Sequence, residues 1–342
     1  MNTSASTWQQ FEDLVQRILE ANNFEVHVHS PRGDKGFDFV AQLAGERWAV
    51  EVKYYRTMRA QPALIESAAK RVVSNGTSSG ATRGMLVVSC FLTNELRYVL
   101  EQKFSIAFVD QVDLRNWCAA HPALSEELDA LLEANPSEPQ ATDPTRQDPA
   151  LRSQSINNLP PPSLDTRGTD LCRELKSIKK GKKSWAQYER TCEKILRYLF
   201  PNDLLGWHSQ MRTDDGLNRY DLVCRVRSTT EFWKFVIDHL DSRYILFEFK
   251  NYSAKIKQGQ ILTTEKYLLK RGLRRTAIIM TRSGADPHAV AMTQGAMREQ
   301  GKLMLVVDDE KVCQMLHMKE RGEDPTDYLF EIADNFLLKL PR

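Results

Sequence analysis

The sequence repeats one succession of motifs on either side of a proline-rich stretch. The first half opens with Trp8-Gln-Gln-Phe11-Glu12 and the second with Trp185-Ala-Gln-Tyr188-Glu189, each at the start of an apolar pattern with helical spacing. Each half then continues with a strand that bears an aspartate, a strand with the pattern Glu-x-Lys, and two apolar strands. An order of motifs that recurs within one chain predicts two similar structural units.

In both copies the predicted elements follow the order helix, strand, strand, helix, strand, helix, strand. The aspartate strands contain Asp38 and Asp221, and the next strands contain Glu51-Val-Lys53 and Glu248-Phe-Lys250. This alternation predicts the α/β class, with a mixed central sheet flanked by helices in each domain. The second copy has an insertion, Ser228–Tyr244, which predicts an additional helix whose aromatic side chains serve packing by default.

A proline-rich segment separates the two copies. Residues 134–165 contain seven of the 14 prolines of the chain and no aromatic residue, a composition typical of a disordered linker. We therefore predict an N-terminal domain at 1–133, a linker at 134–165 and a C-terminal domain at 166–342. The C-terminal domain begins with a basic stretch, Glu174–Trp185, which either contacts nucleic acid or is a solvated helix end.

The Glu-x-Lys strands carry the chemistry that the sequence predicts. Side chains two apart in a strand share a face, so Glu51 and Lys53 lie together, and the residue between them points into the core. An adjacent aspartate strand adds a second carboxylate at the same end of the sheet. Two carboxylates can hold Mg²⁺, and a lysine can stabilise negative charge on a phosphate. A lone Glu-x-Lys is weak evidence, because exposed strands often alternate charges, but here the whole set occurs twice.

These motifs resemble the PD-(D/E)xK, or restriction-endonuclease-like, nuclease superfamily. The first half is similar to its Mrr-like branch through Phe11-Glu12, the turn from Gly33 to Asp38, and Glu51-Val52-Lys53-Tyr54. The second half matches less closely, through the run from Asp215 to Asp221 and Glu248-Phe249-Lys250. The resemblance implies two restriction-endonuclease-like domains and Mg²⁺-dependent cleavage of DNA, with Mn²⁺ able to substitute, often in bacterial defence against foreign DNA. RNA is a less favoured substrate.

The predicted site residues fall into three groups. The catalytic candidates of the two copies are Asp38, Glu51, Lys53, Asp221, Glu248 and Lys250. The metal ligands would be the four carboxylates of that set, with two helical glutamates as further candidates, Glu12 and Glu189. The candidates for contact with nucleic acid are Lys255, Lys257, Arg219, Lys70 and Arg71, each of which could equally be a surface or ion-pairing residue. Branches of the superfamily place a glutamine after the lysine, for which Gln61 and Gln260 are candidates.

Charge, cysteine content and the absence of certain motifs limit the partners and the cellular compartment that the sequence predicts. The net charge is −4 over residues 1–133 and +8 over 166–342, so the second half is the better candidate for phosphate contact. The six cysteines contain no Cys-x-x-Cys pair, which argues against a zinc site or a disulfide framework and favours a reducing cytoplasm. We expect no signal peptide and no membrane span. The chain lacks a P-loop, so an ATPase or sensor protein would have to be a partner, and a homo-oligomer is another candidate assembly.

Three functions remain open at this stage. Two working centres in one chain could cut the two strands of a duplex. Alternatively, one copy is catalytic and the other serves as a nucleic-acid-binding or assembly module. In the third case both copies bind without catalysis, although binding alone does not require two complete sets of Asp, Glu and Lys.

Overall fold

The computed structural model describes residues 7–28, 37–132, 146–152, 155–156, 162–211 and 219–341. The chain divides into two compact units, Met1–Asp165 with Arg321–Glu323, and Thr166–Glu320 with Asp324–Arg342. Parts of two predicted turns, residues 33–36 and 215–218, lie outside the described residues. No helix in the described part of the chain is both long and apolar enough to cross a bilayer.

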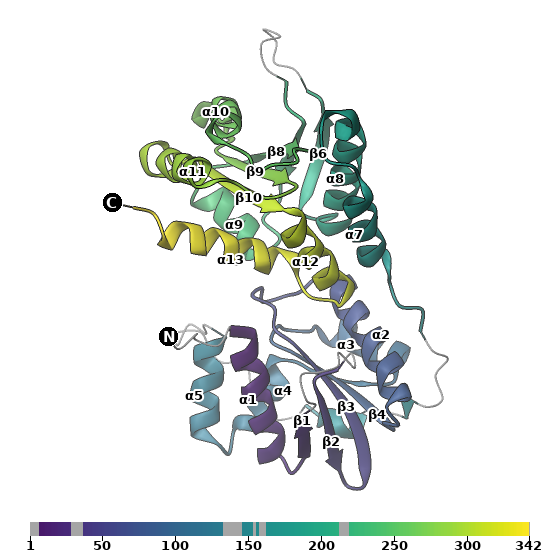
Figure 1. The fold of residues 1–342 in the computed structure, drawn as a ribbon. Helices are drawn as coiled ribbons and strands as arrows, with labels where there is room; N and C mark the ends of the chain where they lie inside the picture. The colour runs from purple at the N-terminus through teal and green to yellow at the C-terminus, as the bar shows by residue number, and fades with distance from the viewer. Residues whose placement is uncertain are drawn as a thin grey trace. The chain divides into compact units, whose positions relative to one another are not determined.

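The first unit is built on a five-stranded mixed sheet with strand order β1-β2-β3-β4-β5 (Figure 1). The first two pairings are antiparallel and the last two are parallel. Its elements in chain order are α1 (Thr7–Ala21), β1 (Glu25–Val28), β2 (Phe39–Leu43), β3 (Glu46–Lys53), α2 (Pro62–Ser78), β4 (Arg83–Val88), α3 (Asn94–Phe104), β5 (Ala107–Val109), α4 (Gln111–Cys118), α5 (Pro122–Leu131) and α6 (Pro149–Arg152).

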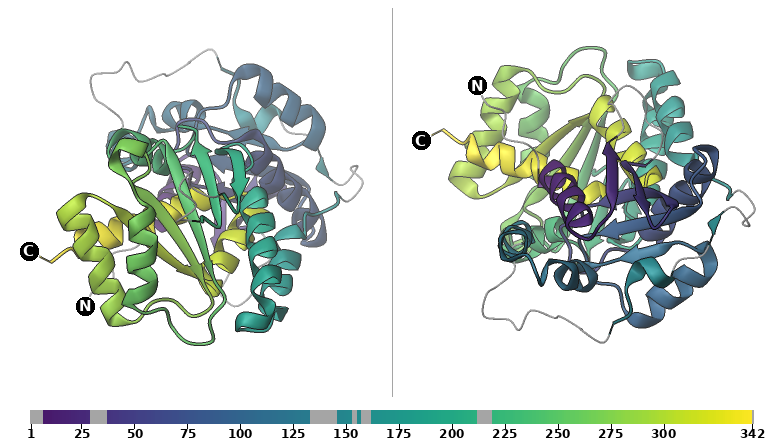
Figure 2. Two further views of the ribbon diagram at one scale, coloured as in Figure 1. Left: turned by 90° about the horizontal axis from the view of Figure 1, so that it is seen from above. Right: turned by 90° about the horizontal axis from the view of Figure 1, so that it is seen from below.

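The second unit contains a sheet of the same design, with order β10-β9-β8-β7-β6 and the same succession of antiparallel and parallel pairings. Figure 2 shows its green strands between teal and yellow-green helices. Its elements are α7 (Arg167–Ser177), η2 (Lys182–Ser184), α8 (Trp185–Leu199), β6 (Leu204–Ser209), β7 (Leu222–Val226), α9 (Glu231–Asp238), β8 (Tyr244–Lys250), α10 (Gln258–Tyr267), η3 (Lys270–Gly272), β9 (Thr276–Thr281), α11 (Pro287–Gln300), β10 (Leu303–Asp308), α12 (Asp309–Glu320) and α13 (Pro325–Leu338).

The predicted fold class, two mixed sheets flanked by helices, is confirmed. The predicted element order is incomplete, because each sheet has one more strand before the aspartate strand, β1 or β6. These strands are short or half-exposed at the sheet edge, so their sequences carry little apolar signal. The predicted helix in the insertion is α9, and its Phe232 and Trp233 are buried in the core, as the packing interpretation expects.

Alternation along the strands assigns the two faces of each sheet. In β3, Val50 and Val52 pack with α1 side chains, whereas Ala49 packs in a separate cluster with residues of α2. In β8, Phe247 and Phe249 pack with α8, and Leu246 packs with the cluster that includes α10 and α11 residues. By period two, the Glu-x-Lys side chains of both copies therefore face the side of α2 or α10.

Two residues of the predicted linker segment contact the first domain. Arg146 forms ion pairs with Asp110 at 2.6 Å and with Asp113 at 3.3 Å, and its side chain is only 5% exposed. Ile156 is fully buried in the α2 cluster, and its backbone N–H donates to Thr82. The composition of 134–165 averages over the segment, so it hides single residues that reach back into a domain.

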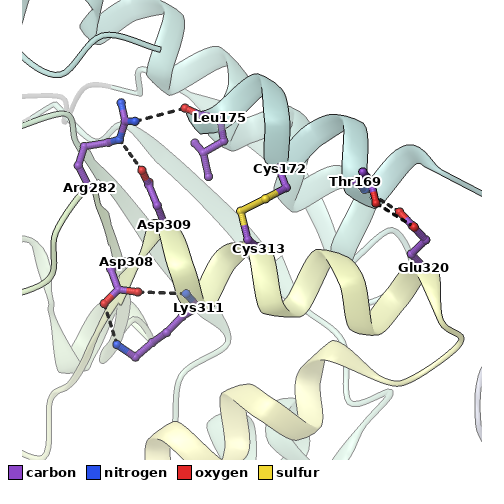
Figure 3. The surroundings of a disulfide bond; sticks show 9 residues. All are labelled: Thr169, Cys172, Leu175, Arg282, Asp308, Asp309, Lys311, Cys313 and Glu320. Carbon is purple, nitrogen blue, oxygen red and sulfur yellow. Dashed lines mark hydrogen bonds and ion pairs between the residues drawn. A yellow bond between two sulfur atoms is a disulfide. The ribbon is translucent and has the colours of Figure 1, made fainter. Parts of the chain in front are cut away.

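A disulfide lies within the second unit, although the cysteine spacing argued against a disulfide framework. It joins Cys172 of α7 to Cys313 of α12, which are 141 positions apart in the sequence (Figure 3). The helices pack tightly, since a Cβ at Gly168 would lie 2.4 Å from the carbonyl oxygen of Leu316. The two cysteines are far apart in the sequence, so their spacing does not indicate that they pair. The bond depends on the packing of α7 against α12.

The described structure predicts that Ile156 stabilises the first domain. The Ile156→Ala variant should lower the free energy of unfolding by about 2–5 kcal/mol, as for a large-to-small change in a packed core. Leu151→Ala, in the same segment but 74% exposed, is the matched control and should change stability by less than about 0.5 kcal/mol. Urea denaturation measures both. Equal, small effects of the two variants would contradict the packing of Ile156 in the first domain.

The cysteine pairing predicts a thiol count. Protein purified without reductant and then denatured should show four free thiols, those of Cys90, Cys118, Cys192 and Cys224, and six after reduction. Titration with a chromogenic disulfide reagent measures this directly. A Cys172→Ser/Cys313→Ser variant should show four thiols under both conditions, and six thiols in the unreduced wild-type protein would contradict the pairing.

Candidate active site

In the first domain, the ends of two adjacent strands bring the predicted residues together. Asp38 directly precedes β2, and its neighbour Phe39 pairs with Val50 of β3. Glu51 and Lys53 lie at the end of β3, on the same sheet face as Asp38 by alternation. Val52 between them is buried, but so is Glu51, which is only 3% exposed.

Two contacts fix this arrangement. An Asp38 carboxylate oxygen accepts a hydrogen bond of 2.7 Å from the backbone N–H of Val52. The ammonium nitrogen of Lys53 lies 2.5 Å from Oε1 of Glu51. The aspartate is thus attached to the middle of the Glu-x-Lys motif, and the glutamate and lysine are paired with each other.

The second domain repeats both contacts. An Asp221 carboxylate oxygen accepts from the backbone N–H of Phe249 at 2.9 Å, and Lys250 Nζ donates to Glu248 Oε2 at 2.6 Å. Glu248 is 2% exposed. The duplicated sequence motif therefore folds into a duplicated geometry, including the hydrogen bond from the residue between Glu and Lys.

Burial and neighbouring charges shift the pKa values of the paired groups. Burial raises the pKa of Glu51 to about 7, with the Asp38 charge adding to the rise and Lys53 opposing it. Burial likewise raises the pKa of Glu248 to about 7, against the opposing effect of Lys250. Burial on its own would lower the pKa of each lysine, but the adjacent carboxylates outweigh it and both lysine pKa values are raised. The lysines are therefore charged at neutral pH.

Helices α1 and α8 each add a glutamate to the candidate site of their domain. Burial, followed by the charge of Asp38, raises the pKa of Glu12 to about 8. Burial and then Asp221 raise the pKa of Glu189 to about 7, and Gln210 donates to Glu189 Oε2 at 2.9 Å. Each domain thus gathers three carboxyl groups and one lysine closely enough for their charges to interact.

The carboxyl groups have one feature that suits a cation. Oε2 of Glu51 and Oε1 of Glu248 are buried and receive no hydrogen bond from the described residues. Buried carboxylate oxygens normally have a partner, and a hard cation such as Mg²⁺ is one that prefers oxygen ligands. Within the described ranges, however, no three His, Cys, Asp or Glu side chains form a group arranged to hold a metal. The donor chemistry fits a divalent cation, and the side-chain arrangement shown does not by itself define one.

The predicted nucleic-acid contacts divide into two kinds. Burial raises the pKa values of Glu51 and Glu189, and the charges of Arg71 and Arg219, respectively, oppose that rise. Both arginines therefore lie near the carboxyl groups. Lys255 and Lys257 are exposed after β8, and Lys70 is half-buried in α2. The two arginines are therefore placed to act on a site, whereas the lysines lie on the surrounding surface.

The candidate glutamines occupy helix starts. Gln61 is the N-cap residue of α2, directly before Pro62. Gln260 Oε1 accepts from the backbone N–H of Lys257 at 2.9 Å, in the first turn of α10. The Gln260 side chain is therefore engaged in capping its own helix.

Sequence reasoning missed an aromatic cluster at the second site. Tyr267 packs edge-on against Tyr220 with ring centroids 5.1 Å apart, and Arg274 donates to the Tyr220 hydroxyl at 2.8 Å. Burial raises the pKa of Tyr267, with the next contribution from the Glu248 charge, which places Tyr267 close to the carboxyl groups. Tyr220 adjoins Asp221 and was within reach of motif reading, but Tyr267 ends α10 and Arg274 follows that helix, and neither carries a local signal.

Comparison with known proteins assigns the first domain to a class. Residues 3–118 match the family model Mrr_cat, described as restriction endonuclease. The N-terminal domain is thus similar to restriction endonucleases, and the match supports the Mrr-like prediction for this copy. The match does not extend to the second copy.

The other comparisons add little. No curated protein matches the chain. Among solved structures, the crystal structure of AF1548, a protein of unknown function, is 18% identical and covers 55% of this chain and 87% of its own, with a TM-score of 0.25. A similarity at that level carries no argument about fold or function.

The buried Glu–Lys pair predicts a coupled effect on stability. Removing one partner leaves an unpaired buried charge, so Lys250→Met should destabilise the second domain by about 3–5 kcal/mol. Adding Glu248→Gln should recover much of that loss, giving a coupling energy of about 1–3 kcal/mol in a double-mutant cycle. Denaturant unfolding of the four proteins measures it. Strictly additive effects would show that the two side chains do not interact in solution.

Proposed function

We propose that the chain is a metal-dependent endonuclease that hydrolyses phosphodiester bonds of DNA, with one catalytic centre in each domain. The observation that carries this proposal is the repeated geometry of Asp, Glu and Lys. Asp38 and Asp221 bind the same backbone position of their Glu-x-Lys strands, and each glutamate pairs with its lysine. The restriction-endonuclease match of residues 3–118 supports the same chemistry for the first domain.

The residues of each site have distinct roles in this proposal. Glu51 and Glu248, with Asp38 and Asp221, would hold Mg²⁺ through the carboxylate oxygens that face the site, and Mn²⁺ would substitute. Glu12 and Glu189 extend each set of oxygen ligands. The bound cation would supply an activated water and neutralise charge on the scissile phosphate.

The lysines act through position and charge. Lys53 and Lys250 are held by their glutamates within 2.6 Å, so each ammonium occupies a defined place beside the carboxylates. A positive charge fixed there before substrate binds stabilises the negative charge that develops on the phosphate, without reorganisation during the reaction. Arg71 and Arg219 add positive charge at the same edges and orient the substrate strand.

Two centres in one chain would cut the two strands of a duplex, as two single-domain subunits do together. DNA is proposed over RNA, and bacterial defence against foreign DNA is the proposed setting, on the strength of the restriction-endonuclease match to the first domain. An oligomer or an ATPase partner would extend this activity and is not required by the two-centre arrangement.

The proposal predicts a separable loss of strand cuts. Supercoiled plasmid is incubated with Mg²⁺, Mn²⁺ or EDTA and the wild-type chain, Lys53→Met, Lys250→Met and the double variant. The wild type should produce linear DNA only with metal, each single variant should produce nicked circles, and the double variant should lose at least about 10²-fold in rate. Thermal unfolding followed by circular dichroism confirms that each variant is folded before its activity is compared.

Three other outcomes of the plasmid assay would contradict parts of the proposal. Activity that survives in one single variant and vanishes in the other would make one copy a binding domain. Metal-independent cleavage would contradict the proposed role of the carboxylates. Absence of cleavage of unmodified DNA, with folded wild-type protein and either metal, would contradict the proposed endonuclease activity on that substrate.

A further inference from the structure

The second domain contains a basic loop beside its candidate site that none of the assigned roles explains. This basic loop, Lys179–Lys183, follows α7, includes the first two residues of the short helix η2 and contains four lysines. All four are exposed. It corresponds to the basic stretch that sequence alone left open between nucleic-acid contact and a solvated helix end.

The loop is attached to the catalytic strand. Asn251 directly follows Lys250 and is only 6% exposed. Its side-chain amide donates to the carbonyls of Lys179 and Gly181, both at 3.0 Å, and its own carbonyl accepts from the Gly181 N–H at 2.7 Å. Gly181 has φ of +111°, a conformation that side chains with a Cβ rarely adopt, which allows this close approach. Three hydrogen bonds thus fix the loop one residue beyond the candidate catalytic lysine.

A second buried residue holds the start of the loop. Arg282 donates to the carbonyls of Ile178 at 2.8 Å and Leu175 at 3.3 Å, to the Asn251 Oδ1 at 3.0 Å, and pairs with Asp309 at 2.6 Å. Figure 3 shows the guanidinium of Arg282 reaching both Asp309 and the end of α7. The backbone under the lysines is therefore rigidly positioned, which an ordinary solvated helix end does not require.

The lysines differ in what they contact. Lys180 donates to the Ser283 hydroxyl at 3.1 Å and is engaged with the domain. The ammonium groups of Lys179, Lys182 and Lys183 have no ion pair or hydrogen bond within the described parts of the chain. Unpaired cations on a fixed backbone lose little conformational freedom of the chain when an anion binds, so such a surface suits an extended polyanion.

We propose that Lys179, Lys182 and Lys183 form a phosphate-binding surface for the nucleic-acid backbone at the second site, and so position the strand that Lys250 and Glu248 act on. The inference rests on the proposed function for its polyanion, but it concerns binding and not cleavage. In the first domain Tyr54 stands where Asn251 does, and its hydroxyl donates to the carbonyl of Leu131. The residue after the candidate catalytic lysine therefore has different partners in the two domains.

Binding measured without cleavage tests this. The full chain is titrated onto a fluorescent DNA duplex in EDTA at several salt concentrations. A Lys179→Ala/Lys182→Ala/Lys183→Ala variant should bind about tenfold more weakly near 100 mM salt, and its plot of log affinity against log salt should be shallower by about 2–3 units. Replacement of the same three lysines by arginine should retain wild-type binding.

The matched control removes three positive charges from the opposite end of the sheet. Arg227 follows β7, Lys234 lies in α9 and Arg243 precedes β8, all exposed and away from the Asp221 and Lys250 ends of those strands. Replacement of these three by alanine changes net charge equally and should leave the salt slope within about one unit of the wild type.

A site-resolved measurement accompanies the titration. Acetylation of lysines followed by mass spectrometry should show protection of Lys179, Lys182 and Lys183 by DNA, and none at Lys234. Equal losses in the loop and control variants, or no protection at the loop, would overturn the proposal, as would a wild-type chain that binds no DNA. The plasmid assay is independent, so a chain that binds through the loop without cutting would contradict the endonuclease and retain the binding surface.

Discussion

The buried pairing of a glutamate with a lysine two residues later is the interaction on which both candidate sites depend. An unpaired carboxylate with 2–3% exposure would be strongly destabilising, and so would an unpaired ammonium. Pairing them allows both charges to remain at the end of a central strand that is otherwise apolar. The glutamate raises the pKa of its lysine, and the lysine limits the rise that burial causes in the pKa of the glutamate. Charged groups are therefore retained where an ordinary core would exclude them.

The aspartate has a structural role that complements this pairing. Asp38 and Asp221 each accept the N–H of the residue between Glu and Lys, so each joins the start of one strand to the end of the next. That hydrogen bond holds two carboxyl groups close together despite their repulsion. Burial is the main cause of the raised pKa values of Glu51 and Glu248, and the charge of the aspartate adds to the rise. A site that stores carboxylate repulsion is suited to binding a cation, because the cation relieves that repulsion.

Sequence was sufficient for the parts of the structure that depend on local pattern. Period-two alternation placed Glu51 with Lys53 on one face, and the repeated motif order predicted two mixed sheets. It was insufficient where the determining contact is distant in the chain. The edge strands β1 and β6 were not included in the element order, because half-exposed strands lack an apolar run. The burial of Ile156 and the Cys172–Cys313 bond depend on tertiary packing that no spacing of residues indicates.

The two copies retain the same central geometry but differ in what surrounds it. The position after the lysine is Tyr54 in the first domain, where the ring packs on Phe11 at 5.6 Å, and Asn251 in the second, where the amide holds a basic loop. The residue at this position thus contributes to an aromatic pair in the first domain and to the support of a charged surface in the second. Since the N–H of the residue between Glu and Lys donates to the aspartate in both domains, the surroundings can diverge without disturbing the carboxylates. A duplicated chain can in this way change the surface beside one candidate site while both domains retain the buried Glu–Lys pair and its aspartate.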